Sequence, residues 1–135
     1  MKKTILIADD DEEICDELAD ILKEKGYLTR SVYDGQSAWE LIQREAFDTV
    51  ILDLKLPLMT GFEVLRRARE LPRKIKIIVI SGRPMKSMLK DPSTILGHNP
   101  DPEEEEILRS SDVFLNKPFP IDTLLEHVRR LSGRI

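Results

Sequence analysis

The sequence predicts an α/β protein of the doubly wound class, with a five-stranded parallel sheet in the order 2-1-3-4-5 and helices on both faces. Short runs rich in Ile, Val and Leu alternate with longer amphipathic stretches along the chain. The short runs are nearly continuous in apolar residues, which is typical of strands buried on both faces of a parallel sheet. Regular alternation of the two patterns favours right-handed crossovers between parallel strands.

Five apolar runs are the expected strands, and we expect the 135 residues to form a single domain, 1–135. The runs are Ile5–Ala8, Leu28–Val32, Thr49–Leu52, Ile75–Ile80 and Val113–Leu115. A hydrophobic fraction of 41% is adequate for the core of a chain of this length.

Helical periodicity follows each of the first two strands. After Asp10 and Asp11, apolar residues recur on one stripe of a helix, which Gly26 is expected to end. Either aspartate would cap this helix, since a carboxylate accepts the unpaired N–H groups of the first turn. Asp34 and Gly35 open a second helix.

Two further helices carry clear end signals. Thr60 and Glu63 form a capping box before an apolar stripe, and Pro72 is expected to close that helix. The last helix follows Pro120, and its apolar residues lie on one side: Ile121, Leu124, Leu125, Val128 and Leu131.

The stretch 82–101 breaks this rhythm, because it contains three prolines and lacks a clean period. It is long for a connection from a strand to a helix, where roughly 2–6 residues are usual. We expect an unusual long segment here, with a lid, a docking loop and disorder all open as alternatives. Asp101 and Pro102 would cap and open a short helix whose N-terminus the acidic run Glu103–Glu106 favours.

Composition argues against several classes of protein. The net charge of −4 disfavours nucleic-acid binding, which needs a basic face. No apolar run approaches the length of a membrane span, and the first apolar run is too short for a signal-peptide core. The single cysteine, Cys15, allows no internal disulfide and fits a reducing compartment, so we expect a cytoplasmic protein.

Acidic residues follow two strands that the predicted topology makes neighbours. Asp9–Asp11 follow the first strand and Asp53 follows the third. In doubly wound folds, ligands bind where the carboxyl ends of such strands meet. Clustered carboxylates raise each other's pKa unless a cation neutralises them, and Mg²⁺ prefers oxygen ligands. We therefore predict a Mg²⁺ site made by Asp9, Asp10 and Asp53, and interpret the acids at 11–13 as a helix cap and first-turn residues.

Ser81 follows the fourth strand and Lys117 follows the fifth. The hydroxyl can donate to a phosphoryl oxygen, and the ammonium can neutralise a second oxygen of the same group. Taken singly, each residue is more often a loop serine or a solvated lysine. Because both follow strands at the same edge of the sheet as the acids, we predict that they share one site.

At these positions the sequence resembles the receiver domain of bacterial two-component response regulators, which has a flavodoxin-like fold of the kind seen in chemotaxis receivers. Four motifs in order carry the resemblance: Ile5–Asp11, Asp53–Gly61, Ile78–Gly82 and Lys117–Phe119. The match covers nearly all of the chain except the segment after Gly82, and the distance from Ser81 to Lys117 exceeds the family's usual spacing by about a dozen residues.

The resemblance implies a role for each matching acid. Asp53 would be the phosphoacceptor and also a Mg²⁺ ligand. Asp10 would ligate the ion directly, and Asp9 directly or through water. The backbone carbonyl of Lys55 would be a further ligand.

The resemblance also implies a switch that reports phosphorylation. Ser81 would move toward the phosphoryl group, Lys117 would bind a phosphoryl oxygen, and Phe114 would swing between outward and inward rotamers. Gly82 would keep the acceptor accessible. The peptide bond before Pro118 would be cis, which X-Pro bonds tolerate.

The function so implied is that of a phosphoacceptor signalling module rather than an enzyme. A sensor histidine kinase or a histidine phosphotransfer protein would supply the phosphoryl group, and phosphorylation would switch a surface read by an unknown protein target. Because the donor histidine belongs to the partner, His98 and His127 need no catalytic role. Whether the chain forms a homodimer, and whether it is a stand-alone protein or a fragment of a longer one, both stay open. Substituting Lys55 or Arg83 beside the site is expected to alter the phosphoryl lifetime.

Two other functions compete with this one. A phosphatase of the haloacid-dehalogenase type would use Asp9 in its D-x-D pattern as the nucleophile, but it would leave Asp53 without a role. A receiver fold used only for binding would not need the full set of acids, hydroxyl and lysine.

Overall fold

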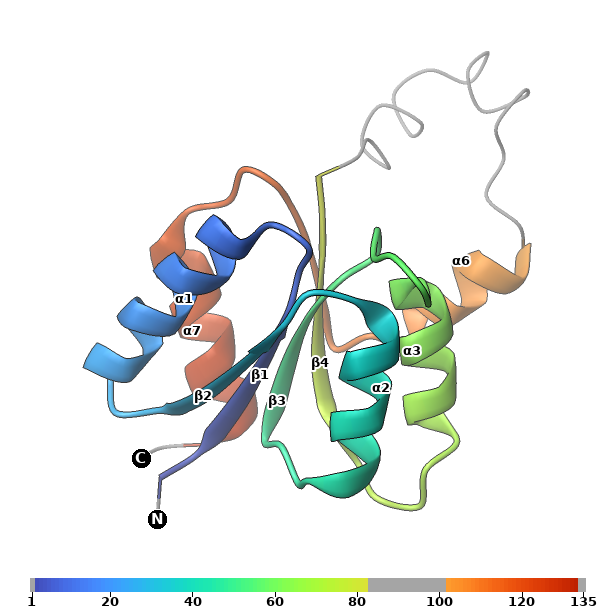
Figure 1. The fold of residues 1–135 in the computed structure, drawn as a ribbon, viewed down its shortest axis with the longest axis horizontal. Helices are drawn as coiled ribbons and strands as arrows, with labels where there is room; N and C mark the ends of the chain where they lie inside the picture. The colour runs from blue at the N-terminus through green and yellow to red at the C-terminus, as the bar shows by residue number, and fades with distance from the viewer. Residues whose placement is uncertain (1, 83–101, 134–135) are drawn as a thin grey trace.

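The computed structural model describes residues 2–82 and 102–133, which form a five-stranded parallel sheet with helices on both faces (Figure 1). The strand order is β2-β1-β3-β4-β5, as predicted. Each strand bound lies within one residue of the expected run. The strands are β1 (Thr4–Ala8), β2 (Leu28–Val32), β3 (Thr49–Asp53), β4 (Lys76–Ser81) and β5 (Val113–Asn116).

Five helices of the described residues cover the two faces of the sheet. Figure 1 shows α1 and α7 on one face and α2, α3 and α6 on the other. Their bounds are α1 (Glu12–Glu24), α2 (Gly35–Arg44), α3 (Gly61–Arg69), α6 (Pro102–Arg109) and α7 (Ile121–Ser132). No helix among the described residues is both long enough and apolar enough to cross a membrane.

The central strand β1 shows why the apolar runs are continuous. Ile5 and Ile7 pack in the core beneath α1 and α7, whereas Leu6 and Ala8 pack in the core beneath α2 and α3. All four side chains are fully buried. Successive side chains of a strand point to opposite faces, so a strand covered on both sides needs an apolar residue at every position.

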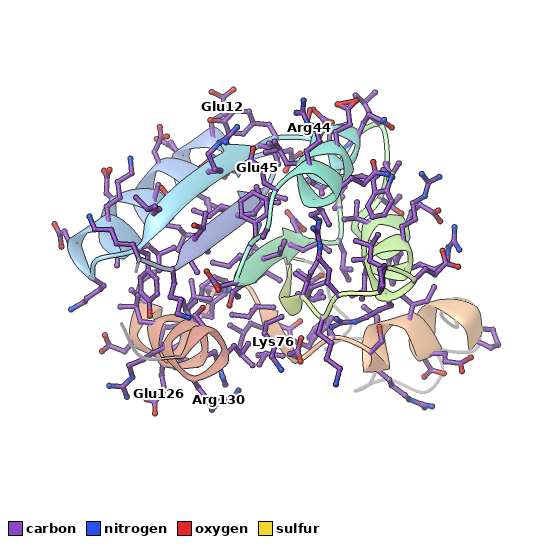
Figure 2. The ribbon with its side chains drawn as sticks, turned by 90° about the horizontal axis from the view of Figure 1, so that it is seen from below. Glu12, Arg44, Glu45, Lys76, Glu126 and Arg130 are labelled. Atoms are coloured by element: carbon purple, nitrogen blue, oxygen red, sulfur yellow. The ribbon has the colours of Figure 1, made fainter. Side chains whose placement is uncertain are left out.

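The helix α7 is amphipathic, as its sequence predicts. Leu124 and Val128 are fully buried against the sheet, while Glu126 and Arg130 are exposed. Figure 2 shows the last two side chains pointing away from the sheet. The apolar stripe therefore sets which face of this helix packs on the sheet.

The expected aspartate caps open α1 and α2. Asp11 Oδ1 accepts the backbone N–H groups of Glu13 at 3.0 Å and Ile14 at 3.3 Å. Asp34 Oδ1 accepts that of Ser37 at 2.6 Å. The sequence left Asp10 and Asp11 open as the cap of α1, and the structure selects Asp11.

Two helix ends were predicted from a glycine and a proline. Helix α1 ends at Glu24, and Gly26 takes the positive φ of 97° that glycine adopts without steric cost. Helix α3 ends at Arg69, three residues before Pro72, so the proline lies in the turn after the helix rather than at its last residue.

Only half of the predicted capping box at α3 forms. Thr60 Oγ1 accepts the N–H of Glu63 at 3.2 Å. The Glu63 carboxylate, however, accepts from the guanidinium groups of Arg66 and Arg67 instead of turning back to Thr60. The guanidinium groups, one turn away on the same helix face, form charge-assisted hydrogen bonds with Glu63 and compete with the neutral N–H of Thr60. These bonds lower the pKa of Glu63 to about 2.

A single arginine joins α3 to the chain around α6 and β4. Arg69 donates through Nε to Ser110 O at 2.9 Å, through Nη1 to Ile75 O at 2.7 Å and through Nη2 to Asp112 Oδ2 at 3.0 Å. The same Asp112 oxygen accepts the N–H of Ile77 at 2.7 Å. The guanidinium thus fixes the turn after α6 to the start of β4.

The helix expected after Pro102 is present as α6. Most of the unusual segment 82–101 lies outside the described residues, as do the expected roles of Arg83, His98 and the cap at Asp101.

Candidate functional site

The acidic residues predicted to meet are brought together at the carboxyl edge of the sheet. Asp9 follows β1, and Asp53 is the last residue of β3, which pairs directly with β1. Asp9 has no exposed surface and Asp53 is 4% exposed. The order β2-β1-β3 places the ends of these two strands side by side, which is where a doubly wound sheet binds ligands.

Three carboxylates are close enough to share one cation. Oxygen atoms of Asp9, Asp10 and Asp53 lie within 4.8 Å of one another, and Asp10 is exposed to solvent. An all-oxygen donor set with one solvent-facing ligand fits Mg²⁺, which usually keeps several waters and takes only one or two carboxylates. The residues present therefore fit the ion that the sequence predicted.

Lys117 reaches the same pocket from the end of β5. Its Nζ lies 2.7 Å from Asp9 Oδ2 and 3.2 Å from Asp53 Oδ2, so the ammonium bridges the two buried carboxylates. The peptide bond from Lys117 to Pro118 is cis, as expected. The fold thus unites a lysine with acids more than sixty positions earlier in the chain.

Backbone N–H groups and one thiol donate hydrogen bonds to the other oxygen atoms of Asp9 and Asp53. Asp9 Oδ1 accepts the N–H of Asp11 at 2.9 Å, and Asp53 Oδ1 accepts the N–H of Lys55 at 3.0 Å. The buried Cys15 thiol donates to Asp9 O at 3.3 Å. Lys55 therefore contacts the site through its N–H, and the ligand role expected of its carbonyl stays a prediction.

The electrostatics of the pocket favour an additional cation. Burial raises the pKa of Asp53, the Asp9 charge raises it further, and the Lys55 N–H and Lys117 only partly offset this. For Lys117, burial lowers the pKa, but hydrogen bonds and charges from Asp9 and Asp53 outweigh it and leave the pKa raised. Among the residues that the structure describes, one ammonium pairs with two of the three carboxylates, so these residues leave a net negative charge at the site.

The two predicted switch residues lie on β4 and β5. Ser81 ends β4, is 5% exposed and pairs in register with Asn116. Its carbonyl accepts the N–H of Lys117 at 2.8 Å, which ties the switch serine to the lysine of the pocket. Phe114 is half-buried and packs against the core beneath α2 and α3. The structure thus places Ser81 beside the acid pocket and Phe114 further along β5.

Gly82 stands next to this site without a steric requirement for glycine. A Cβ added there would lie 3.6 Å from Lys117 Cδ, an ordinary van der Waals contact. Its expected part in keeping the acceptor accessible stays a prediction.

Sequence reasoning assigned no role to the glycine that begins α3 or to the buried amide on β5. A Cβ on Gly61 would lie 2.2 Å from Asp53 O, so only glycine lets α3 start this close to Asp53. A glycine at the first helical position, where better helix formers are available, is the signal that could have shown this. Asn116 Oδ1 is buried without a hydrogen-bond partner in the described part of the chain, and no sequence signal indicates it.

Comparison with known proteins agrees with this geometry. Residues 5–95 match the model of the response regulator receiver domain family. Response regulator GtcR of Aneurinibacillus migulanus is 32% identical to this chain over all 135 of its residues, and the match covers 48% of GtcR. Response regulator receiver protein CpdR of Brucella abortus (strain 2308) is 31% identical, with 96% of each chain covered.

A solved structure shows the same fold. A CheY-like response regulator receiver domain protein from Methanospirillum hungatei JF-1 superposes with a TM-score of 0.79 at 28% identity, covering 98% of this chain and 94% of that one. The chain thus spans about half of one curated relative and nearly all of another. With a family match over more than half of its residues, the chain belongs to the response regulator receiver domain family.

Proposed function

We propose that this chain accepts a phosphoryl group on Asp53 and thereby switches a surface that binds a partner protein. One observation carries the proposal: the buried Asp53 carboxylate shares a pocket with Asp9, Asp10 and the Lys117 ammonium. Such a pocket stabilises a transferring phosphoryl group mainly by positioning and by charge.

Asp9, Asp10 and Asp53 are the side chains that would hold Mg²⁺, together with the Lys55 carbonyl. The bound ion supplies positive charge against the phosphoryl oxygens. Lys117 supplies a second positive charge. We propose that its ammonium, which bridges Asp9 and Asp53 in the structure, transfers one of its hydrogen bonds to a phosphoryl oxygen.

The chemical step joins an Asp53 carboxylate oxygen to phosphorus. As this O–P bond forms, the bond from phosphorus to the donor's leaving group breaks, and the leaving group departs with the electron pair and takes a proton from solvent. With a phosphohistidine donor, the broken bond is P–N and the imidazole is released. The product is an acyl phosphate on Asp53.

The proposed donor is a sensor histidine kinase or a histidine phosphotransfer protein, and the proposed compartment is the cytoplasm. Ser81 and Phe114 would report the new phosphoryl group to a protein target. The chain would catalyse no reaction beyond its own phosphorylation and dephosphorylation.

The phosphatase alternative would need Asp9 as the nucleophile. Both carboxylate oxygens accept hydrogen bonds in Asp9 and in Asp53 alike, but Asp9 has no exposed surface, whereas Asp53 is 4% exposed. The small exposed surface of Asp53 favours it as the acceptor, and a nucleophilic Asp9 would leave Asp53 without a role.

The proposal is tested by incubating the chain with acetyl phosphate and MgCl₂. Intact mass should show one phosphoryl group per chain, peptide mapping should place it on Asp53, and EDTA should suppress it. Asp53→Asn should remove the label, while the matched control Asp20→Asn, at an exposed position of α1, should retain it. Label persisting in Asp53→Asn, or repeated phosphate release that depends on Asp9, would contradict the proposal.

A further inference from the structure

We propose that Leu58 and Tyr33 form an apolar rim that docks the protein phosphodonor beside Asp53. This inference rests on the proposed function and deepens it by assigning a surface to the donor. The name apolar rim is kept below for these two residues.

The first observation is that Leu58 adopts a backbone conformation unfavourable for its side chain. Its φ is 69°, in the left-handed region that favours glycine and asparagine. The N–H of Met59 donates to Pro57 O at 2.8 Å, which closes a three-residue turn with Leu58 at its tip. Turns of this kind with a positive φ at the central residue are rare and strained. A leucine is therefore not what local backbone stability would select here.

The second observation is that Leu58 gains little burial in return. It is 84% exposed, more than either of the other exposed large hydrophobic residues in the described ranges, Leu28 at 50% and Tyr33 at 39%. A residue that is both strained and solvated stabilises the folded chain less than asparagine would at that position. Strain at an exposed position is a sign of function rather than of packing.

The third observation is that backbone contacts join this turn to the loop that carries Tyr33. Pro57 O also accepts the N–H of Gly35 at 3.1 Å. A Cβ on Gly35 would lie only 1.6 Å from Met59 O, so the β2–α2 loop and the turn are in direct contact. A turn whose backbone is already held presents its side chain to a partner at a lower ordering cost than a loose loop would.

The apolar rim lies at the end of the sheet that holds the acceptor. Tyr33 follows β2 and Leu58 follows β3, so both come after the carboxyl ends of strands, as Asp9 and Asp53 do. Figure 1 shows the β2–α2 and β3–α3 loops at the upper edge of the sheet, the edge that the β1–α1 loop also occupies. Leu28, at the start of β2, lies at the opposite end.

This position fits a protein donor better than the other ligands of an apolar surface. We expect a small donor such as acetyl phosphate to react at Asp53 without needing the rim. The net charge of −4 disfavours an anionic membrane as the partner. A protein that carries a phosphohistidine must instead rest on the loops around Asp53 while it presents the phosphoryl group, and apolar anchors at the contact provide affinity.

The test compares two donors on Leu58→Asn. Acetyl phosphate with MgCl₂ should label the variant at a rate within about twofold of the wild-type rate. Transfer from the ATP-phosphorylated cytoplasmic part of a histidine kinase, measured with the receiver below saturation, should be about tenfold slower in the variant. A tenfold loss is the size expected for one apolar anchor. The kinase used in this test is chosen from a set of purified histidine kinases as the one that phosphorylates the wild-type chain fastest. Thermal unfolding of Leu58→Asn should occur no lower than that of the wild type, because asparagine tolerates φ near 69°.

Leu28→Asn is the matched control, since it makes the same change at an exposed leucine away from the acceptor. It should leave both transfer rates unchanged, and Tyr33→Asn should slow only the kinase reaction. Three outcomes would each overturn the apolar rim. The kinase could phosphorylate Leu58→Asn as fast as the wild type, or Leu58→Asn could lose the same fraction of its labelling rate with both donors. The wild type could also be labelled by acetyl phosphate but by no kinase. Failure of acetyl phosphate to label the wild type would instead refute the proposed function, and the rim with it.

Discussion

Individual residues of this chain show where local sequence predicts a contact and where it does not. Asp34 and Thr60 were both predicted at the openings of α2 and α3, and each accepts an N–H of the following turn. The capping motif also predicted that Glu63 would bond back to the chain, and this half was wrong. A helix cap needs only a backbone N–H about three residues further along the chain. The hydrogen-bond partner of a flexible glutamate side chain depends instead on every cation within its reach.

Glu63 makes the stability of the chain depend on pH. Its pKa of about 2 lies below the ordinary 4.5, so its ion pairs contribute stability that is fully present above pH 4.5 and is lost as the pH falls toward 2. Chemical denaturation from pH 7 to pH 2 should therefore show a loss in the wild type that Glu63→Gln lacks. The difference should be at most about 1 kcal/mol, because solvent screens these pairs. Glu17→Gln, an exposed control on α1, should follow the wild type; a wild-type loss equal to that of Glu63→Gln would refute the assignment.

At the scale of elements, apolar patterning predicted the described strands and most of the described helices, because strand and helix faces are set by neighbours in sequence. Helix α6 was predicted from Pro102 and the acidic run after it instead. Neither pattern predicted how α6 is attached. Arg69 makes three hydrogen bonds to residues that lie close only after α3, β4 and the turn before β5 have packed together.

Removing this arginine should cost more stability than removing an exposed one. Arg69→Ala removes the arginine donor from the carbonyls of Ile75 and Ser110 and leaves Asp112 with only the N–H of Ile77. It should lower the free energy of unfolding by about 1–3 kcal/mol. Arg30→Ala is the control: it removes only a surface pair with Glu45, with an expected loss of about 0–1 kcal/mol. Urea denaturation measures both, and equal losses would show that the Arg69 network contributes no more than a surface pair.

At the scale of the whole molecule, the acid pocket links ion binding to folding. An ion held only by the folded chain should stabilise it, by about 1.4 kcal/mol when Mg²⁺ is present at ten times its dissociation constant. Thermal unfolding with and without MgCl₂ should show this as a higher midpoint. Asp10→Asn should abolish the shift without loss of the fold, because Asp10 is exposed, while Asp20→Asn should retain it. A midpoint that Mg²⁺ raises equally in Asp10→Asn would exclude Asp10 as a ligand.

By itself the sequence determined the number and order of the described elements, the caps at Asp34 and Thr60, and the acids, serine and lysine at the strand ends. These follow from patterns within a few residues of each position. Tertiary structure alone decided that Lys117 bridges Asp9 and Asp53, that burial raises the pKa of Asp53, and that Leu58 is exposed at a positive φ. Such properties depend on which distant strands and loops meet, and on how much water their meeting excludes.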